Sequence, residues 1–168
     1  MKYLSLLFLV LTAACNSSRY FIVRHAEKAV LSRDSAGMMA NNPPLSEAGK
    51  VRSFVLRDEL AHKKIRHIYS TNTLRTTSTA EPLSNAKSLP MKFYSNVDTL
   101  VNLVKSIKGQ VLIVGHSNTV DDIVNKLCGQ VKIATDVKDG EYDNLFIVKI
   151  KGKKAVFQKH KYGYPSNP

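Results

Sequence analysis

The sequence has few of the residues that crosslink a chain. Only two cysteines, Cys15 and Cys128, occur among its 168 residues, which excludes the disulfide framework that stabilises many small exported domains. Long internal repeats and low-complexity tracts are also missing, so solenoid and fibrous architectures are excluded. A single ordinary globular domain is the class that fits this length and composition.

The sequence also lacks an apolar run long enough to cross a bilayer. The longest run, residues 4–11, is interrupted only by Ser5 and falls well short of the roughly 20 residues that a membrane span needs. Small residues and Cys15 follow it. This order resembles the lipobox of bacterial lipoproteins, which implies cleavage before Cys15 and its lipidation. An ordinary secretory signal with an incidental cysteine is the alternative.

The lipobox resemblance sets the expected domain organisation and location. Several acyl chains would anchor the protein firmly, since one chain alone binds a membrane weakly. Asn16 stands where Asp would indicate retention at the inner membrane of some bacteria, so we expect an exported protein anchored to the cell envelope at the outer membrane. Cys128 then has no partner, and its apolar surroundings predict a buried, inert thiol. The expected segments are a signal peptide, a lipidated cysteine with its tether, one folded domain and a tail: 1–14, 15–18, 19–164 and 165–168.

Acidic residues are scarce. There are 13 of them against 25 lysines and arginines, which gives a formal net charge of +12. This excess favours anionic partners such as phosphorylated substrates, anionic lipid or nucleic acid. No nucleic-acid-binding motif accompanies the charge, so we expect no nucleic-acid partner. The lysines near the C-terminus alternate with apolar residues, which predicts the solvated face of a hairpin: Lys149, Lys151, Lys153, Lys154, Lys159 and Lys161.

Apolar patterning predicts strands that alternate with helices. Helices are expected after the N-cap Ser46, from residue 73 with a bend or restart at Pro82, over 97–107 and over 119–128. This order predicts an α/β fold, a three-layer α/β/α sandwich with a mostly parallel central sheet. The expected strands, with the third at an edge and the last two forming a hairpin, are 19–23, 65–69, 91–94, 111–114, 145–150 and 154–160.

Polar residues follow three of these strands. Arg24 and His25 come after the first strand, Arg75 follows the second, and His116 follows the strand over 111–114. Ligands of parallel α/β sheets bind beyond the carboxyl ends of the strands. The three sequence-distant clusters are therefore expected to meet at one edge.

The same clusters carry a family resemblance. Val23-Arg24-His25-Ala26-Glu27-Lys28 resembles the Arg-His-Gly signature of the histidine phosphatase superfamily, in its Arg-His-Ala-Glu-Lys form. Three further segments are similar to family motifs in the family's order, over 44–49, 69–80 and 114–119. The resemblance runs from about Tyr20 to Gly163, and it implies a phosphoglycerate mutase-like fold and phosphatase activity.

The resemblance also implies residue roles. His25 attacks phosphorus and forms a phosphohistidine, and a neutral imidazole suits this because a phosphate dianion repels anionic nucleophiles. Arg24 and Arg75 hold the phosphoryl oxygens with fixed guanidinium forks, and His116 supplies a further donor. Asn118 is a candidate phosphate contact. We expect no metal and no cofactor, because the arginines supply the positive charge, and a small phosphorylated substrate or a phosphoprotein as partner.

The proton donor for the leaving group is the least defined role. One branch of the family has an Asp directly after the second histidine, where this chain has Ser117. Glu27 is also a candidate for orienting the His25 loop. Without an acid, good leaving groups such as phosphohistidine or acyl phosphate would be favoured. The candidate acids are Glu27, Asp98, Glu141 and Asp143.

Four other functions are considered. A mutase is less favoured, because it must retain and reorient its product under a lid, and this sequence has little material for one. The main candidate for a substrate-facing flap is the loop over 29–43. A non-catalytic surface lipoprotein could use the same pocket to bind a phosphorylated glycan, lipid or protein, and a pseudoenzyme scaffold is the third possibility. A serine hydrolase is disfavoured, because Thr119 replaces the closing glycine of the nucleophile elbow.

Overall fold

The computed structural model describes residues 17–30 and 41–166. The predicted signal peptide, the lipidation site Cys15 and most of the predicted flap lie outside the described residues. Within them, strands and helices alternate in the predicted order: β1 Ser17–Arg24, α2 Glu47–Ala61, β2 Ile65–Ser70, α3 Leu74–Lys87, β3 Met91–Phe93, α4 Val97–Ser106, β4 Gln110–Gly115, α5 Ser117–Cys128, β5 Asn144–Lys151 and β6 Lys154–Lys161.

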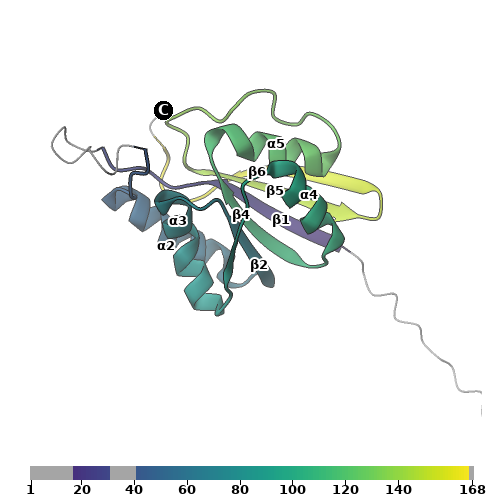
Figure 1. Ribbon diagram of the computed structural model, residues 1–168, viewed down its shortest axis with the longest axis horizontal. Helices are drawn as coiled ribbons and strands as arrows, with labels where there is room; N and C mark the ends of the chain where they lie inside the picture. The colour runs from purple at the N-terminus through teal and green to yellow at the C-terminus, as the bar shows by residue number, and fades with distance from the viewer. Residues whose placement is uncertain (1–16, 31–40, 167–168) are drawn as a thin grey trace, which may run out of the picture.

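One sheet of six strands forms the centre of the molecule (Figure 1). Its order is β3-β2-β4-β1-β5-β6. The first four strands pair in parallel, while β5 pairs antiparallel with both β1 and β6. The predicted α/β fold with a mostly parallel sheet is confirmed, and the short β3 lies at an edge as predicted.

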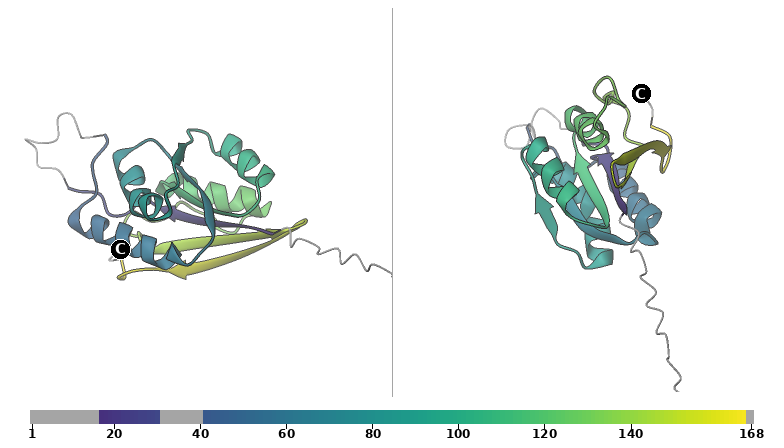
Figure 2. Two further views of the ribbon diagram at one scale, coloured as in Figure 1. Left: turned by 90° about the horizontal axis from the view of Figure 1, so that it is seen from below. Right: turned by 90° about the vertical axis from the view of Figure 1, so that its right-hand side faces the viewer.

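Helices cover both faces of this sheet (Figure 2). Alternate residues of a strand point to opposite faces, so Tyr20 and Ile22 of β1 pack with α4 and α5 in one core. Phe21 and Val23 pack with α2 and α3 in the other core. Because residues 20–23 of β1 and 111–114 of β4 are buried on both faces, these stretches are continuously apolar rather than alternating.

One of the two outcomes predicted at Pro82, a restart of the helix, is wrong, and so is the prediction that Cys128 is buried. α3 runs without interruption from Leu74 to Lys87 with Pro82 inside it, so proline does not restart the helix. Proline removes one backbone donor, and the burial of Ala80 and Leu83 holds the turns on both sides of it against the sheet. Cys128 is only partly buried, although burial still raises the pKa of its thiol. Of the described helices, none has the length and apolar character to span a bilayer.

Candidate active site

A cavity of about 500 Å³ lies at the carboxyl ends of β1 and β4. The four residues given the main roles in the sequence-based prediction line it together, and they come from three separate segments of the chain. The predicted phosphate contact Asn118 lines it as well. The lining consists of Arg24, His25, Lys28, Asn41, Pro43, Arg75, His116, Ser117, Asn118 and Asp139.

The register of the parallel strands explains this convergence. Arg24 of β1 is level with Gly115 of β4, and Ser70 of β2 is level with Val114. The backbone N–H of His25 donates to the Gly115 carbonyl at 2.9 Å. Because the strands end at the same level, the residues that follow them are brought side by side.

The His25 ring is held in one tautomer. Its Nδ1 lies 2.7 Å from the carbonyl oxygen of Ala26, and a carbonyl only accepts hydrogen bonds, so Nδ1 carries the proton. Nε2 therefore keeps its lone pair, and no described residue bonds to it. The side chain is 3% exposed, and its ring centre lies 5.4 Å from that of His116. The orientation of the His25 ring is thus one in which Nε2 is available to a ligand.

Both imidazoles are neutral at pH 7. Burial, followed by the positive charges of Arg24 and Arg75, lowers the pKa of His25 to about 3. Burial and the same two arginines lower the pKa of His116 to about 4. A neutral imidazole keeps a lone pair on one ring nitrogen and is the nucleophilic form of histidine. A neutral His116 still donates one hydrogen bond from its protonated ring nitrogen.

The lowered pKa of His25 predicts a stability that falls in acid. The unfolded imidazole binds a proton below its ordinary pKa of 6.5, while the folded imidazole does not until the pH reaches about 3, so the unfolded state gains protons first. We expect this group alone to reduce the free energy of unfolding by about 1 kcal/mol between pH 7 and 5.5. Urea denaturation at the two pH values would measure this for the wild type and for His25→Gln.

The His25→Gln variant should lose less stability on acidification than the wild type. The matched variant His160→Gln removes an exposed imidazole and should behave like the wild type. Equal acid sensitivity in all three proteins would mean that His25 is not held neutral by the fold.

The two arginines present unpaired donors. Nε of Arg24, and Nε and Nη1 of Arg75, are buried without a hydrogen-bond partner among the described residues. Burial and the charge of Arg24 lower the pKa of Arg75 below its ordinary value. Buried, unpaired donors on adjacent cations are unfavourable until an anion binds them. The cavity is therefore suited to a phosphoryl group.

Arg24 is fixed by its remaining nitrogens. Nη1 donates to the carbonyls of Lys138 and Asp139 at 2.8 and 2.9 Å, and Nη2 donates to the Asp139 carboxylate at 2.9 Å. The guanidinium also lies over the Tyr142 ring, 4.5 Å from its centre. These contacts fix the orientation of the guanidinium group.

The start of α5 adds further donors to the cavity. His116 is the N-cap of this helix, and Ser117 and Asn118 occupy its first turn and line the cavity. The backbone N–H groups at a helix N-terminus carry partial positive charge and bind anions. Asn118 thus lines the cavity from the first turn of this helix.

Motif residues outside the cavity position the loop that follows β1. The Thr79 hydroxyl accepts from the backbone N–H of Ala26 at 2.9 Å, and the backbone N–H of Ser46 donates to the Glu27 carbonyl at 2.9 Å. A Cβ on Gly49 would lie 2.2 Å from that carbonyl. Gly49 therefore permits the close approach of α2 to the His25 loop.

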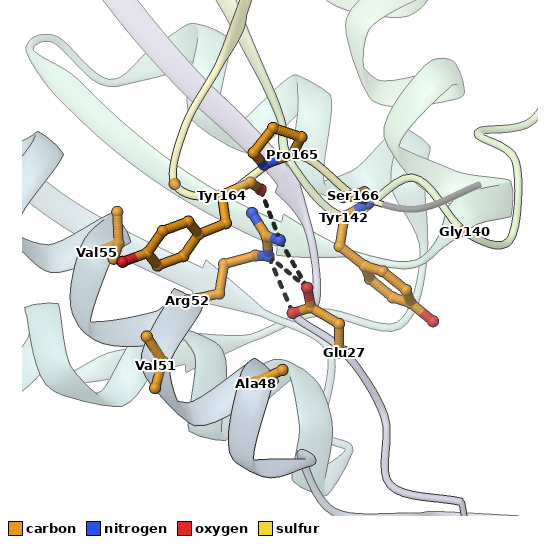
Figure 3. Close-up of a pocket in the computed structure, with 11 residues that line it drawn as sticks. Glu27, Ala48, Val51, Arg52, Val55, Gly140, Tyr142, Tyr164, Pro165 and Ser166 are labelled. Carbon is orange, nitrogen blue, oxygen red and sulfur yellow. Dashed lines mark hydrogen bonds and ion pairs between the residues drawn. The ribbon is translucent and has the colours of Figure 1, made fainter.

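Glu27 orients this loop instead of lining the cavity. Its carboxylate accepts from Arg52 Nε at 2.8 and 2.9 Å, and Arg52 Nη2 lies 2.7 Å from Oε1. Figure 3 shows the two side chains pointing toward each other from α2 and the loop after β1. Arg52 also donates to the carbonyls of Tyr162 and Tyr164. This ion pair ties the His25 loop to the C-terminal segment.

We expect Arg52→Leu to destabilise the protein by about 2 kcal/mol, because it leaves the partly buried Glu27 carboxylate without its partner. Lys50→Leu is the matched control, since Lys50 pairs with Glu47 at an exposed position and such pairs contribute little. Urea midpoints of the two variants would measure the difference. Similar midpoints would contradict the structural role given to the Arg52 pair.

The other three candidate acids are engaged away from the cavity, and none of them lines it. Asp98 is exposed and forms an ion pair on the helical face formed by α4 and α5. Glu141 accepts a side-chain hydrogen bond, and Asp143 is a buried partner of an exposed lysine. Their partners are Lys126, Asn144 and Lys161 respectively.

The carboxylate that does line the cavity is Asp139, which the sequence-based prediction missed. It lies in a polar loop without secondary structure, and only its pairing with Arg24 brings it to the site. The approach of Tyr142, whose ring centre is 5.9 Å from that of His25, was missed for the same reason. Within residues 17–30 and 41–166, no group of three His, Cys, Asp or Glu side chains is placed to hold a metal ion.

Solved structures with this fold are numerous, and those described below share low sequence identity with the chain. The protein histidine phosphatase SixA complexed with tungstate has a TM-score of 0.65 at 18% identity, over 85% of this chain and 96% of SixA. A mycobacterial glucosyl-3-phosphoglycerate phosphatase has a TM-score of 0.62 at 11% identity, over 87% and 98%. The phosphoglycerate mutase of Bacillus anthracis str. Sterne has a TM-score of 0.61 at 11% identity, over 87% and 93%. The fold is therefore phosphoglycerate mutase-like.

Part of the amino-acid sequence also matches a protein-family model. The family model of the histidine phosphatase superfamily (branch 1) matches residues 20–98, a range that contains Arg24, His25 and Arg75. Comparison with curated proteins gives no match. The chain is thus similar to this family over the segment from β1 to the start of α4, and the solved structures show a likeness of fold.

Proposed function

We propose that the protein is a phosphohydrolase that passes a phosphoryl group from a phosphomonoester or a related phosphorylated substrate to His25 and then to water. The observation that carries this proposal is a neutral imidazole with a free Nε2 in a cavity that it shares with two arginines bearing unpaired nitrogens. Binding alone would need the arginines and not an oriented nucleophile.

The reaction has two steps. Nε2 attacks phosphorus, an N–P bond forms, and the bond to the leaving-group oxygen breaks. Arg24, Arg75 and the N-terminus of α5 stabilise the charge on the three equatorial oxygens. Water then attacks the phosphohistidine, the N–P bond breaks, and inorganic phosphate leaves. Splitting the reaction in this way makes each displacement easier.

Asp139 is the described carboxylate best placed to protonate the leaving group, because it lines the cavity beside Arg24. Its pKa is lowered by the hydrogen bond from Arg24 and by nearby positive charges. A bound phosphate dianion would oppose that shift through like-charge repulsion. Asp139 therefore replaces the four earlier candidates in the proposed mechanism.

For Asp139→Asn, we expect kcat on an alkyl phosphate to fall by about 100-fold, a typical contribution of general acid catalysis. The kcat on 4-nitrophenyl phosphate should change only a few-fold, because nitrophenolate leaves without a proton. Steady-state kinetics on the two substrates would measure this contrast. Equal losses on both would assign Asp139 to holding Arg24 rather than to proton transfer.

A phosphatase is favoured over a mutase, because a mutase must also retain and reorient its product before releasing it. SixA is named as a protein histidine phosphatase and other structural neighbours as small-molecule phosphatases. A small phosphorylated molecule and a phosphoprotein both fit the open cavity. The test is hydrolysis of 4-nitrophenyl phosphate by the purified protein and its inhibition by vanadate. Tight vanadate binding without hydrolysis would favour the non-catalytic binding protein instead.

We also propose that the protein is exported and anchored to the cell envelope through a lipidated Cys15, at the outer membrane. The support is the apolar run of residues 4–11 followed by small residues and Cys15. Metabolic labelling of the full chain with palmitate tests this, since Cys15→Ala should abolish the label.

A further inference from the structure

The end of the sheet opposite the cavity is strongly basic. In this parallel arrangement the strand starts share one edge, where Ser17 pairs with Lys151 and Lys151 with Lys154. Gln110 of β4 is level with both Arg19 and Ile65. We call the lysines and the arginine at this end the basic edge: Lys63, Lys64, Arg66, Lys105, Lys108, Lys151, Lys153 and Lys154.

These side chains come from three separate segments of the chain that meet at this end of the sheet. Lys105, Lys108 and Lys153 line one hollow of about 500 Å³, together with Ser18 near the start of the described chain. Arg66 lies against Gly109, since a Cβ at that glycine would be 3.2 Å from the arginine side chain. Every member of the basic edge is exposed except Lys63, which is partly buried.

Little negative charge offsets this cluster. No carboxylate lines the hollow. The acidic residues nearest in sequence to Lys63 and Lys64 are Asp58 and Glu59, in the last turn of α2. Asp58 is paired with Arg57. The basic edge therefore presents a net positive field, which attracts an anionic surface over about one Debye length of roughly 10 Å.

The chain enters the fold at this same edge. Ser17 begins β1, and only Asn16 separates it from Cys15. Two residues span at most about 7 Å, so a lipid on Cys15 would hold the basic edge within the reach of headgroup charge. In Figure 1 the start of β1 and the turn between β5 and β6 lie at the same side of the molecule.

We infer that the basic edge docks on the anionic phospholipid headgroups of the membrane that bears the anchor. The choice of membrane rests on the lipid anchor proposed at Cys15, whereas the attraction between the basic edge and anionic headgroups does not need the anchor. β1 spans eight residues, or about 25 Å, between the membrane-facing edge and the catalytic cavity. Docking therefore turns the cavity away from the bilayer, where soluble phosphorylated substrates can reach it.

The test uses vesicle flotation without the lipid. Residues 17–166 contain every described strand, helix and core residue, so a chain that starts at Asn16 keeps the whole described fold. At low ionic strength, we expect it to bind vesicles of phosphatidylglycerol and phosphatidylcholine at least about tenfold more tightly than vesicles of phosphatidylcholine alone. Salt at about 1 M should remove the difference.

Two triple variants of equal charge locate the binding surface. Substituting Lys151, Lys153 and Lys154 with Gln should weaken binding to the anionic vesicles by at least about tenfold. The matched control substitutes three exposed lysines nearer the carboxyl ends of the strands and should retain most of the binding: Lys50, Lys92 and Lys159. Both variants should hydrolyse 4-nitrophenyl phosphate like the wild type, which reports separately on the proposed chemistry.

Equal flotation with the two kinds of vesicle, or equal losses in the two triple variants, would overturn the inference. Binding to a single-stranded oligonucleotide without flotation on either vesicle would overturn it in favour of a nucleic-acid partner. Palmitate labelling of the full chain reports on Cys15 alone, so a failed anchor is distinguishable from failed docking.

Discussion

Replacing His25 with alanine is expected to reduce kcat on any phosphorylated substrate by about 10⁴-fold or more, the scale seen when an enzyme loses its nucleophile. The imidazole is oriented by its bond to the Ala26 carbonyl and kept neutral by burial and two arginines. No other side chain in the described cavity has these properties together, because His116 is turned toward the hydroxyls of Thr71 and Thr73 at 3.4 Å.

The His25→Ala variant should still bind vanadate or inorganic phosphate, because both arginines and the start of α5 remain. This separates a lost nucleophile from a lost binding site. His160→Ala removes an exposed imidazole from β6 and should keep full activity. Steady-state kinetics of both variants on 4-nitrophenyl phosphate make the measurement. Full activity in His25→Ala would remove the mechanism.

Arg75→Lys is expected to lower kcat/KM by about 100- to 1000-fold, the usual cost of removing one donor that stabilises the transition state. Lysine keeps the positive charge but lacks the planar fork, and its ammonium group cannot place two donors on adjacent phosphoryl oxygens. Arg75 is the informative arginine, because two of its nitrogens are unpaired among the described residues. Arg24 also holds a loop, so its loss would mix structural and catalytic effects.

Arg57→Lys provides the matched control for this prediction. Arg57 is on α2 and pairs with Asp58 at the surface, so the substitution should leave kcat/KM unchanged. Arg75→Lys should also weaken inhibition by inorganic phosphate. Should Arg75→Lys retain wild-type kcat/KM, the guanidinium would have no part in stabilising the transferred phosphoryl group.

The layers and the cavity could be predicted because both depend on short-range patterns. Continuous apolar runs such as 111–114 identify buried parallel strands, and parallel strands bring their carboxyl ends together. Once the strands were placed, the positions of Arg24, Arg75 and His116 followed from a few residues of sequence after each strand.

The carboxylates could not be predicted in this way. Their partners are distant in sequence, as for Glu27 and Arg52, which are 25 residues apart, and for Arg24 and Asp139, which are 115 apart. Loop residues carry no periodicity that would place them. The same limit applies to Lys151, Lys153 and Lys154, which the alternation correctly assigned to a hairpin but could not relate to the lysines and arginine preceding other strands.

The central claim is that the phosphoryl group passes through a covalent bond to His25. Rapid acid-free denaturation of the protein during turnover of a radiolabelled phosphorylated substrate, followed by peptide mapping, tests it most directly. The account predicts label that is stable to base, labile to acid, and located on His25, with none in His25→Ala. Label on another residue, or turnover without any label on the protein, would contradict it.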